Sequence, residues 1–165
     1  MNGVSLTYSP TLLFKTSRDC FSVSTFHLKC DGKGATIVFI KSTSGAVFGG
    51  YSKVTWDSND RSVSDSSAFI YSLISSNKEE RFAKMPLKNV NDINAKVCYG
   101  NYGPTFGNGH DIYIADSSNT NTLSYSNPCY AYNCDQSLVY GSAEAKAYMA
   151  GAMYFQVSEI EVYTF

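Results

Sequence analysis

The chain has 165 residues, and its 13 basic and 14 acidic side chains give a net charge of -1. A near-neutral chain has no general electrostatic attraction for phosphate backbones or anionic lipid, so nucleic acid and membrane surfaces are not expected partners. Apolar residues make up 44% of the sequence, and a chain of this length buries a core without a metal or disulfide staple.

Residues 1–11 are a predicted flexible lead-in, and residues 12–165 are predicted to form a single domain. Ser22 is a candidate N-cap because apolar residues follow it at helical spacing, and a glycine-containing turn comes after residue 30. The sequence therefore predicts one short helix over residues 22–30.

Residues 36–41 and 46–52 are predicted to be the two strands of a hairpin, since both are rich in β-branched or aromatic side chains and a turn separates them. Gly49 and Gly50 lie inside the second strand. Glycine within a strand is typical of a bulge or of the close approach of another group, so we expect a packing or contact point there.

The middle of the chain alternates between polar turns and short strands. The strands are expected at residues 68–74, 82–87 and 95–99, with a surface loop at 56–67 and a turn at 77–80.

A glycine-rich turn over residues 100–110 leads into the alternating segment 111–114, which is predicted to be a strand. A polar loop is expected at 117–122. Residues 126–150 show the weakest pattern in the chain.

The last strand is predicted over residues 155–165. Its apolar positions change phase between Val157 and Ile160, so a β-bulge at 158–159 is expected. Glu161 would then stand on an outer face between aromatic side chains, either as a solvated carboxylate or as a charged anchor for a partner.

Together these elements predict a mostly β fold with minor α content, a two-layer antiparallel β-sandwich flanked by short helices.

The first residues have neither the basic nor the apolar section of a secretory signal, and no segment reaches the ~18 consecutive apolar residues of a membrane span. The five cysteines form an odd set without a C-x-x-C pair, which favours buried thiols in a reducing compartment. The expected location is therefore cytoplasmic. Cys129 and Cys134, five residues apart, are spaced so that they could bridge under oxidation.

No catalytic constellation stands out. Cys98, His110 and Asp111 would form a cysteine-nucleophile arrangement if a hairpin paired residues 95–99 with 111–115, but a chance combination is the favoured interpretation. The sequence has no nucleophile elbow, phosphate-binding loop or EF-hand pattern, and no zinc-ligand spacing. No cofactor, metal or catalytic residue is predicted.

A series of short motifs resembles the TLDc domain over residues 12–165. Each motif alone is weak, but their order along the chain is specific. The motifs are Leu12-Leu13-Phe14, Phe26-His27, Phe48-Gly49-Gly50-Tyr51, Trp56, Phe106-Gly107-Asn108-Gly109-His110-Asp111, Phe155-Gln156-Val157 and Glu159-Ile160-Glu161-Val162-Tyr163.

The resemblance implies a non-catalytic interaction module in oxidative-stress protection, with binding and regulation of the vacuolar proton-pumping ATPase as the expected activity. It also implies Glu161, Gly49, Gly50, Gly107 and Gly109 as partner-binding positions, although the glycines have a second interpretation as residues that hold the backbone shape. The alternatives are a cysteine-dependent antioxidant or hydrolytic enzyme and a glycan-binding sandwich that uses exposed tyrosines.

Overall fold

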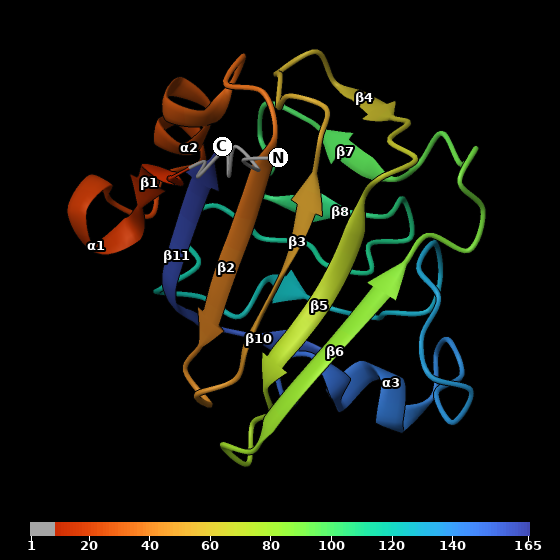
Figure 1. Ribbon diagram of the computed structural model, residues 1–165. Helices are drawn as coiled ribbons and strands as arrows, with labels where there is room; N and C mark the ends of the chain where they lie inside the picture. The colour runs from red at the N-terminus through yellow and green to blue at the C-terminus, as the bar shows by residue number, and fades with distance from the viewer. Residues whose placement is uncertain (1–8) are drawn as a thin grey trace, which may run out of the picture.

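The computed structural model describes residues 9–165, so residues 1–8 of the predicted lead-in lie outside the described residues. Six antiparallel strands form the main sheet, in the order β1-β11-β2-β3-β5-β6 (Figure 1). These strands are β1 (Thr11–Lys15), β2 (Thr36–Ser42), β3 (Val47–Ser52), β5 (Phe69–Ile74), β6 (Glu80–Pro86) and β11 (Val157–Thr164). The predicted hairpin of β2 and β3 is confirmed, and the first and last strands lie side by side.

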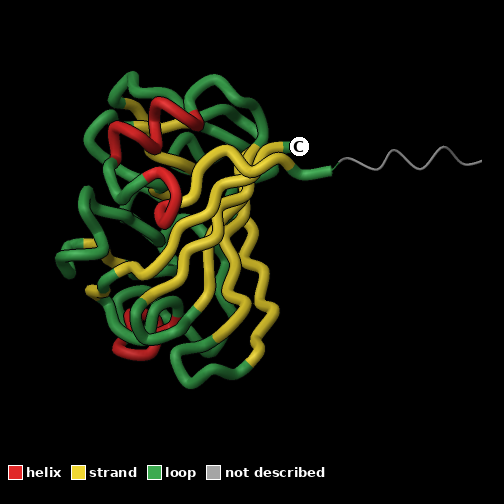
Figure 2. The backbone as a smooth tube through the Cα atoms, turned by 90° about the vertical axis from the view of Figure 1, so that its left-hand side faces the viewer, coloured by secondary structure: helices red, strands yellow, loops and turns green. Residues whose placement is uncertain are grey.

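Smaller sheets and loops cover one face of the main sheet. A three-stranded sheet is formed by β4 (Arg61–Val63), β7 (Lys96–Cys98) and β8 (Thr105–Phe106), and a two-stranded one by β9 (Ser124–Tyr125) and β10 (Tyr154–Phe155). The helices are α1 (Thr16–Asp19), α2 (Val23–Cys30) and α3 (Ala143–Tyr148). Figure 2 shows these elements on the same side of the main sheet, which confirms the predicted fold class.

Aromatic side chains fill the core between the layers. Trp56 is fully buried, and its ring meets those of Phe26 and Phe106 edge to face, at centroid distances of 5.3 and 5.6 Å. Its indole N–H donates to the hydroxyl of Thr36, 2.9 Å away. Because Thr36 begins β2, this bond fixes the tryptophan to the main sheet while its ring contacts the second layer.

Next to this core lies a fully buried lysine. Lys96 donates its ammonium protons to the carbonyls of Val54 and Thr55 and lies over the Trp56 ring. Burial lowers the pKa of Lys96 to about 8. The hydrogen bonds to carbonyls and the cation–π contact offset part of the cost of burying this charge.

The expected bulge in the last strand is confirmed. Val157 pairs with Ser42 and Glu159 with Lys41, so Ser158 is an extra residue in β11. The hydroxyl of Thr16 accepts from the N–H of Ile160 at 2.8 Å and donates to the Glu159 carboxylate. After the bulge, Ile160 and Val162 are buried, so the residue between them points to the outer face.

The helix predicted over 22–30 and the strands predicted at 68–74, 82–87 and 95–99 match α2, β5, β6 and β7 to within two residues at each end. The strand predicted at 111–114 is wrong. Ile112 and Tyr113 form isolated bridges to two different partners, Phe106 and Tyr125, so no continuous ladder develops.

One predicted loop and the weakly patterned segment both contain regular structure. The expected loop at 56–67 includes β4, because Val63 is buried and pairs with Lys96 of β7. The weakly patterned segment 126–150 includes α3. Its N-cap, Ser142, accepts a hydrogen bond from the N–H of Ala145.

The expectation of buried free thiols is correct for Cys30 and Cys98 and wrong for the other cysteines. Cys20 is exposed, and Cys129 is joined to Cys134 by a disulfide with a Cα–Cα distance of 5.3 Å.

Gly50 gives a test of how tightly the layers pack. A Cβ atom there would lie 2.6 to 2.8 Å from the ring of Phe106 on β8. We expect Gly50→Ala to lower the free energy of unfolding by about 1–3 kcal/mol, because overpacking a close-packed core forces the layers apart. Urea denaturation measures the change.

Gly100→Ala is the matched control, since its nearest neighbour would be 3.5 Å from the new Cβ. Equal stability changes in the two variants would contradict the close approach of Phe106 to β3.

Candidate functional site

The outer face of the main sheet carries Glu161, a predicted site residue that is partly exposed. One row of paired residues crosses all six strands: Lys15, Glu161, Phe39, Gly49, Tyr71 and Lys84. The row contains two of the predicted positions, Glu161 on β11 and Gly49 on β3. Strands β2 and β3 separate Glu161 from Tyr71 on β5. Lysine side chains stand at both ends of the row.

Aromatic rings cover the middle of this face. The ring of Phe39 lies edge to face with Tyr71 at 5.7 Å and with Tyr163 at 5.9 Å, and Tyr51 stacks on Phe69 at 5.2 Å. Phe39 thus connects the aromatic residues of β11 with those of β5. We call this surface, from Tyr163 to Phe69, the outer aromatic face.

Two shallow grooves adjoin on the outer aromatic face and share Ile37 and Phe39. The first, of about 380 Å³, runs beside Glu161 and Phe165; the second, of about 400 Å³, runs beside Leu73. Both are lined mainly by apolar side chains. Contiguous exposed apolar surface of this kind marks interaction sites on soluble proteins.

Gly49 allows the flat packing in the centre of the face. A Cβ atom there would lie 2.9 Å from the hydroxyl of Tyr71 and closer still to the carbonyl of Val38. Tyr71 lies across this position and donates its hydroxyl proton to the Val38 carbonyl at 2.7 Å. Burial raises the pKa of Tyr71, so its phenol stays a donor.

Glu161 confirms the expectation of an outward carboxylate between aromatic side chains, but it is not simply solvated. Its Oε1 accepts from Lys15 Nζ and its Oε2 from the Tyr163 hydroxyl, both at 2.7 Å. The hydrogen bond from Lys15 is the main reason that the pKa of Glu161 is lowered, and the bond from Tyr163 adds to it. The carboxylate is therefore ionised and held in one orientation.

The other predicted glycines do not join this face. Gly50 is buried and faces the second layer. Gly107 has a positive φ of 75°, and a Cβ there would lie 2.1 Å from an oxygen of Asp111; a Cβ at Gly109 would lie 2.6 Å from the ring of Tyr130. These contacts favour the interpretation that the three glycines hold the backbone shape.

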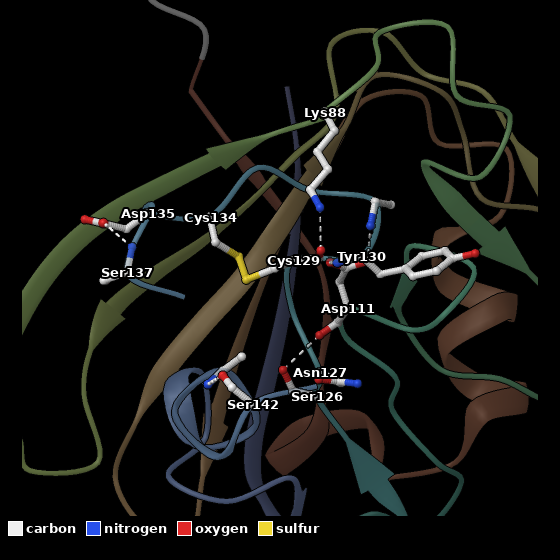
Figure 3. The surroundings of a disulfide bond; sticks show 12 residues. Lys88, Asp111, Ser126, Asn127, Cys129, Tyr130, Cys134, Asp135, Ser137 and Ser142 are labelled. Carbon is white, nitrogen blue, oxygen red and sulfur yellow. Dashed lines mark hydrogen bonds between the residues drawn. A yellow bond between two sulfur atoms is a disulfide. The ribbon is translucent and has the colours of Figure 1, made fainter. Parts of the chain in front are cut away.

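Asp111 organises the segment that carries the disulfide. Its carboxylate accepts from the backbone N–H groups of Tyr130 and Ala131, both at 3.0 Å, and its own carbonyl accepts from the Ser126 hydroxyl at 2.8 Å (Figure 3). Lys88 donates to the carbonyl of Cys129 at 2.6 Å. Burial raises the pKa of Asp111 to about 6, even though the amide donors favour its charged form.

Cys98, His110 and Asp111 do not assemble. β7, which carries Cys98, pairs with β4 and β8, so the conceivable pairing of 95–99 with 111–115 is not formed. Asp111 bonds to backbone amides, as described above, and the imidazole of His110 bonds to Tyr125. Burial raises the pKa of the Cys98 thiol, which opposes formation of a thiolate.

Within residues 9–165, no group of three or more histidine, cysteine, aspartate or glutamate side chains is arranged to hold a metal ion. In the same part of the chain, no helix has the length and apolar character needed to cross a membrane.

Sequence reasoning missed most of the outer aromatic face. Ile37, Phe39 and Phe69 are partly exposed and lie next to buried residues on their strands, and this alternation can be read from the sequence. What the sequence did not show was that β5 and β11 lie on opposite sides of the same hairpin. The strand order β11-β2-β3-β5 brings the aromatic residues of β11 and β5 to a common surface.

The fold and this face define a small β-sandwich module with one covered and one open side. The family model of the TLDc domain matches residues 2–165, and the chain therefore belongs to the TLDc domain family. The match is consistent with an oxidation-resistance type of module. Comparison with curated proteins finds no significant match.

Lys15 gives a test of how Glu161 is held. We expect Lys15→Met to raise the pKa of Glu161 towards its ordinary value, because the charged hydrogen bond that lowers it is removed. A carboxyl-detected NMR titration measures this pKa. Since a lowered folded-state pKa stabilises the fold above the ordinary carboxyl pKa, this contribution is lost as the pH falls through the lowered value.

Lys84→Met is the matched control, as Lys84 ends the same row and lies over Phe69, far from the carboxylate. An unchanged Glu161 titration in Lys15→Met would contradict the ion pair.

Proposed function

We propose that this TLDc domain is a non-catalytic docking module in oxidative-stress protection and that it acts by binding and regulating the vacuolar proton-pumping ATPase. The outer aromatic face is the contact surface, and Glu161 is its charged anchor. The observation that carries the proposal is an oriented carboxylate at the edge of a continuous, uncovered aromatic surface.

The composition of the face supports a protein partner. Tyrosine and phenylalanine contribute large contact areas at a small cost in conformational entropy, and they are enriched in protein interfaces. A carboxylate that is already fixed by Lys15 and Tyr163 loses little freedom on binding. The partner surface that fits would be apolar with a donor or cation opposite Glu161.

Four of the five cysteines are poorly placed for thiol catalysis, which supports a docking role, and Cys20 is the exposed free thiol. Cys30 and Cys98 are buried, and burial raises the pKa of Cys30 to about 12. Cys129 and Cys134 are occupied by their disulfide. The proposed location is cytoplasmic, where the domain would meet the peripheral sector of the pump.

The proposal is tested by the binding of purified domain to the isolated peripheral sector of the vacuolar ATPase, followed by biolayer interferometry. We expect Glu161→Ala to weaken binding about fivefold or more, since truncating an interface anchor costs at least about 1 kcal/mol. Glu144→Ala, at an exposed position in the first turn of α3, is the matched control and should bind like the wild type.

Equal affinities for the two variants would show that Glu161 is not the anchor. Absence of binding by the wild-type domain would instead reject the pump as the partner.

A further inference from the structure

A tyrosine and a histidine on the covered side of the molecule form a hydrogen-bonded pair that the docking function does not use. His110 follows the glycine-rich turn and Tyr125 lies in β9. Nδ1 of His110 and the hydroxyl of Tyr125 are hydrogen bonded, and the two ring centroids are 5.5 Å apart. Both side chains are partly exposed.

The protonation states of the two groups and the tautomer of His110 set the direction of this hydrogen bond. Burial lowers the pKa of His110, so its imidazole is neutral at pH 7 and can present an unprotonated nitrogen. Burial raises the pKa of Tyr125 to about 12, so its phenol is protonated. In the tautomer that leaves Nδ1 unprotonated, Tyr125 donates to His110, and a nitrogen base then stands beside a phenolic proton.

Further tyrosines extend the pair into a chain of neighbouring rings that reaches the surface. Tyr113 lies 5.3 Å from Tyr125 and Tyr102 lies 4.7 Å from Tyr113, measured between ring centroids. Tyr154, whose exposed fraction is 58%, lies 5.9 Å from Tyr125 on the other side. Rings at such distances can exchange an electron, so an oxidising event at the exposed end can reach the pair.

Other hydrogen-bonded tyrosines of the described chain lack an equally good base. Tyr71 and Tyr132 donate to backbone carbonyls, which do not take up protons at neutral pH. Tyr163 donates to Glu161, but Lys15 stabilises that carboxylate in its ionised form. A neutral imidazole accepts a proton more readily than a backbone carbonyl or the ion-paired Glu161 carboxylate. Tyr125 is therefore the tyrosine with the best proton acceptor.

We propose that Tyr125 is a redox-active tyrosine that gives one electron to a radical oxidant, such as an organic peroxyl radical, while its phenolic proton moves to Nδ1 of His110. The O–H bond of Tyr125 breaks and an N–H bond forms on His110. The peroxyl radical is reduced to a peroxide anion, which takes a proton from water to give the hydroperoxide.

Ascorbate completes the cycle. It supplies one electron to the tyrosyl radical and releases one proton to the solvent, which replaces the proton that the peroxide anion took from water. His110 returns its own proton to the phenolic oxygen. The net reaction transfers one hydrogen atom from ascorbate to the peroxyl radical. This activity goes beyond docking, and it is tested with the purified domain alone, so its failure would leave the proposed interaction untouched.

The test uses azide radicals, generated by pulse radiolysis, as the one-electron oxidant of the purified domain. The wild type should form a long-lived tyrosyl radical, detected by absorption and electron paramagnetic resonance. Tyr125→Phe should lose most of this long-lived signal. Tyr140→Phe is the matched control, because Tyr140 is exposed and contacts Tyr130 outside the chain of rings, and it should keep the signal.

A second variant, at His110, tests the contribution of the base while Tyr125 is kept. His110 has a positive φ of 54°, which asparagine tolerates better than most residues, so His110→Asn preserves the backbone while removing the imidazole. We expect slower radical formation and a smaller rate change in heavy water than in the wild type. Thermal unfolding of each variant verifies that it is folded.

Spin trapping of the wild-type protein followed by peptide mass spectrometry gives a result without any variant. Most of the trapped label should be found on Tyr125 and its neighbours Tyr113 and Tyr154. A label spread evenly over all tyrosines, or a Tyr125→Phe variant whose radical decays like that of the wild type, would overturn the proposal.

Discussion

Two consecutive glycines in β3 set the constraint on which both sides of this domain depend. Gly49 leaves room on the outer face, where Tyr71 crosses the strand to reach the Val38 carbonyl. Gly50 leaves room on the inner face, where the ring of Phe106 comes from the second layer. Because neighbouring strand residues point to opposite faces, one glycine could not serve both contacts. The motif therefore determines the packing of the core and the flatness of the proposed docking surface.

Two carboxylates serve different purposes in this fold. Asp111 is fully buried, and its carboxylate accepts hydrogen bonds from the backbone N–H groups of Tyr130 and Ala131. These bonds position the segment closed by the disulfide. Glu161 is partly exposed and is held by groups on its own face, so both its charge and its orientation are available to a partner. A buried carboxylate that accepts backbone hydrogen bonds stabilises local structure, whereas an exposed, oriented one can contribute to recognition.

The sequence predicted features that depend on local pattern. The helix ending near Cys30, the β2–β3 hairpin and the bulge next to Glu159 all follow from the spacing of apolar residues and glycines. It did not predict contacts between distant segments. The ion pair of Lys15 and Glu161 joins residues 146 positions apart, and its formation depends on β1 pairing with β11. The strand predicted after the glycine turn failed for a similar reason, since its residues bond to two separate partners.

The central claim is that the outer aromatic face, and no other surface, meets the partner. Methyl-detected NMR of isoleucine side chains tests it most directly, because Ile37 lies in both grooves of this face, whereas Ile93 is 66% exposed in a loop elsewhere. Addition of the peripheral sector of the vacuolar ATPase should shift or broaden the Ile37 signal and leave that of Ile93 unchanged. A perturbed Ile93 beside an unaffected Ile37 would contradict the account.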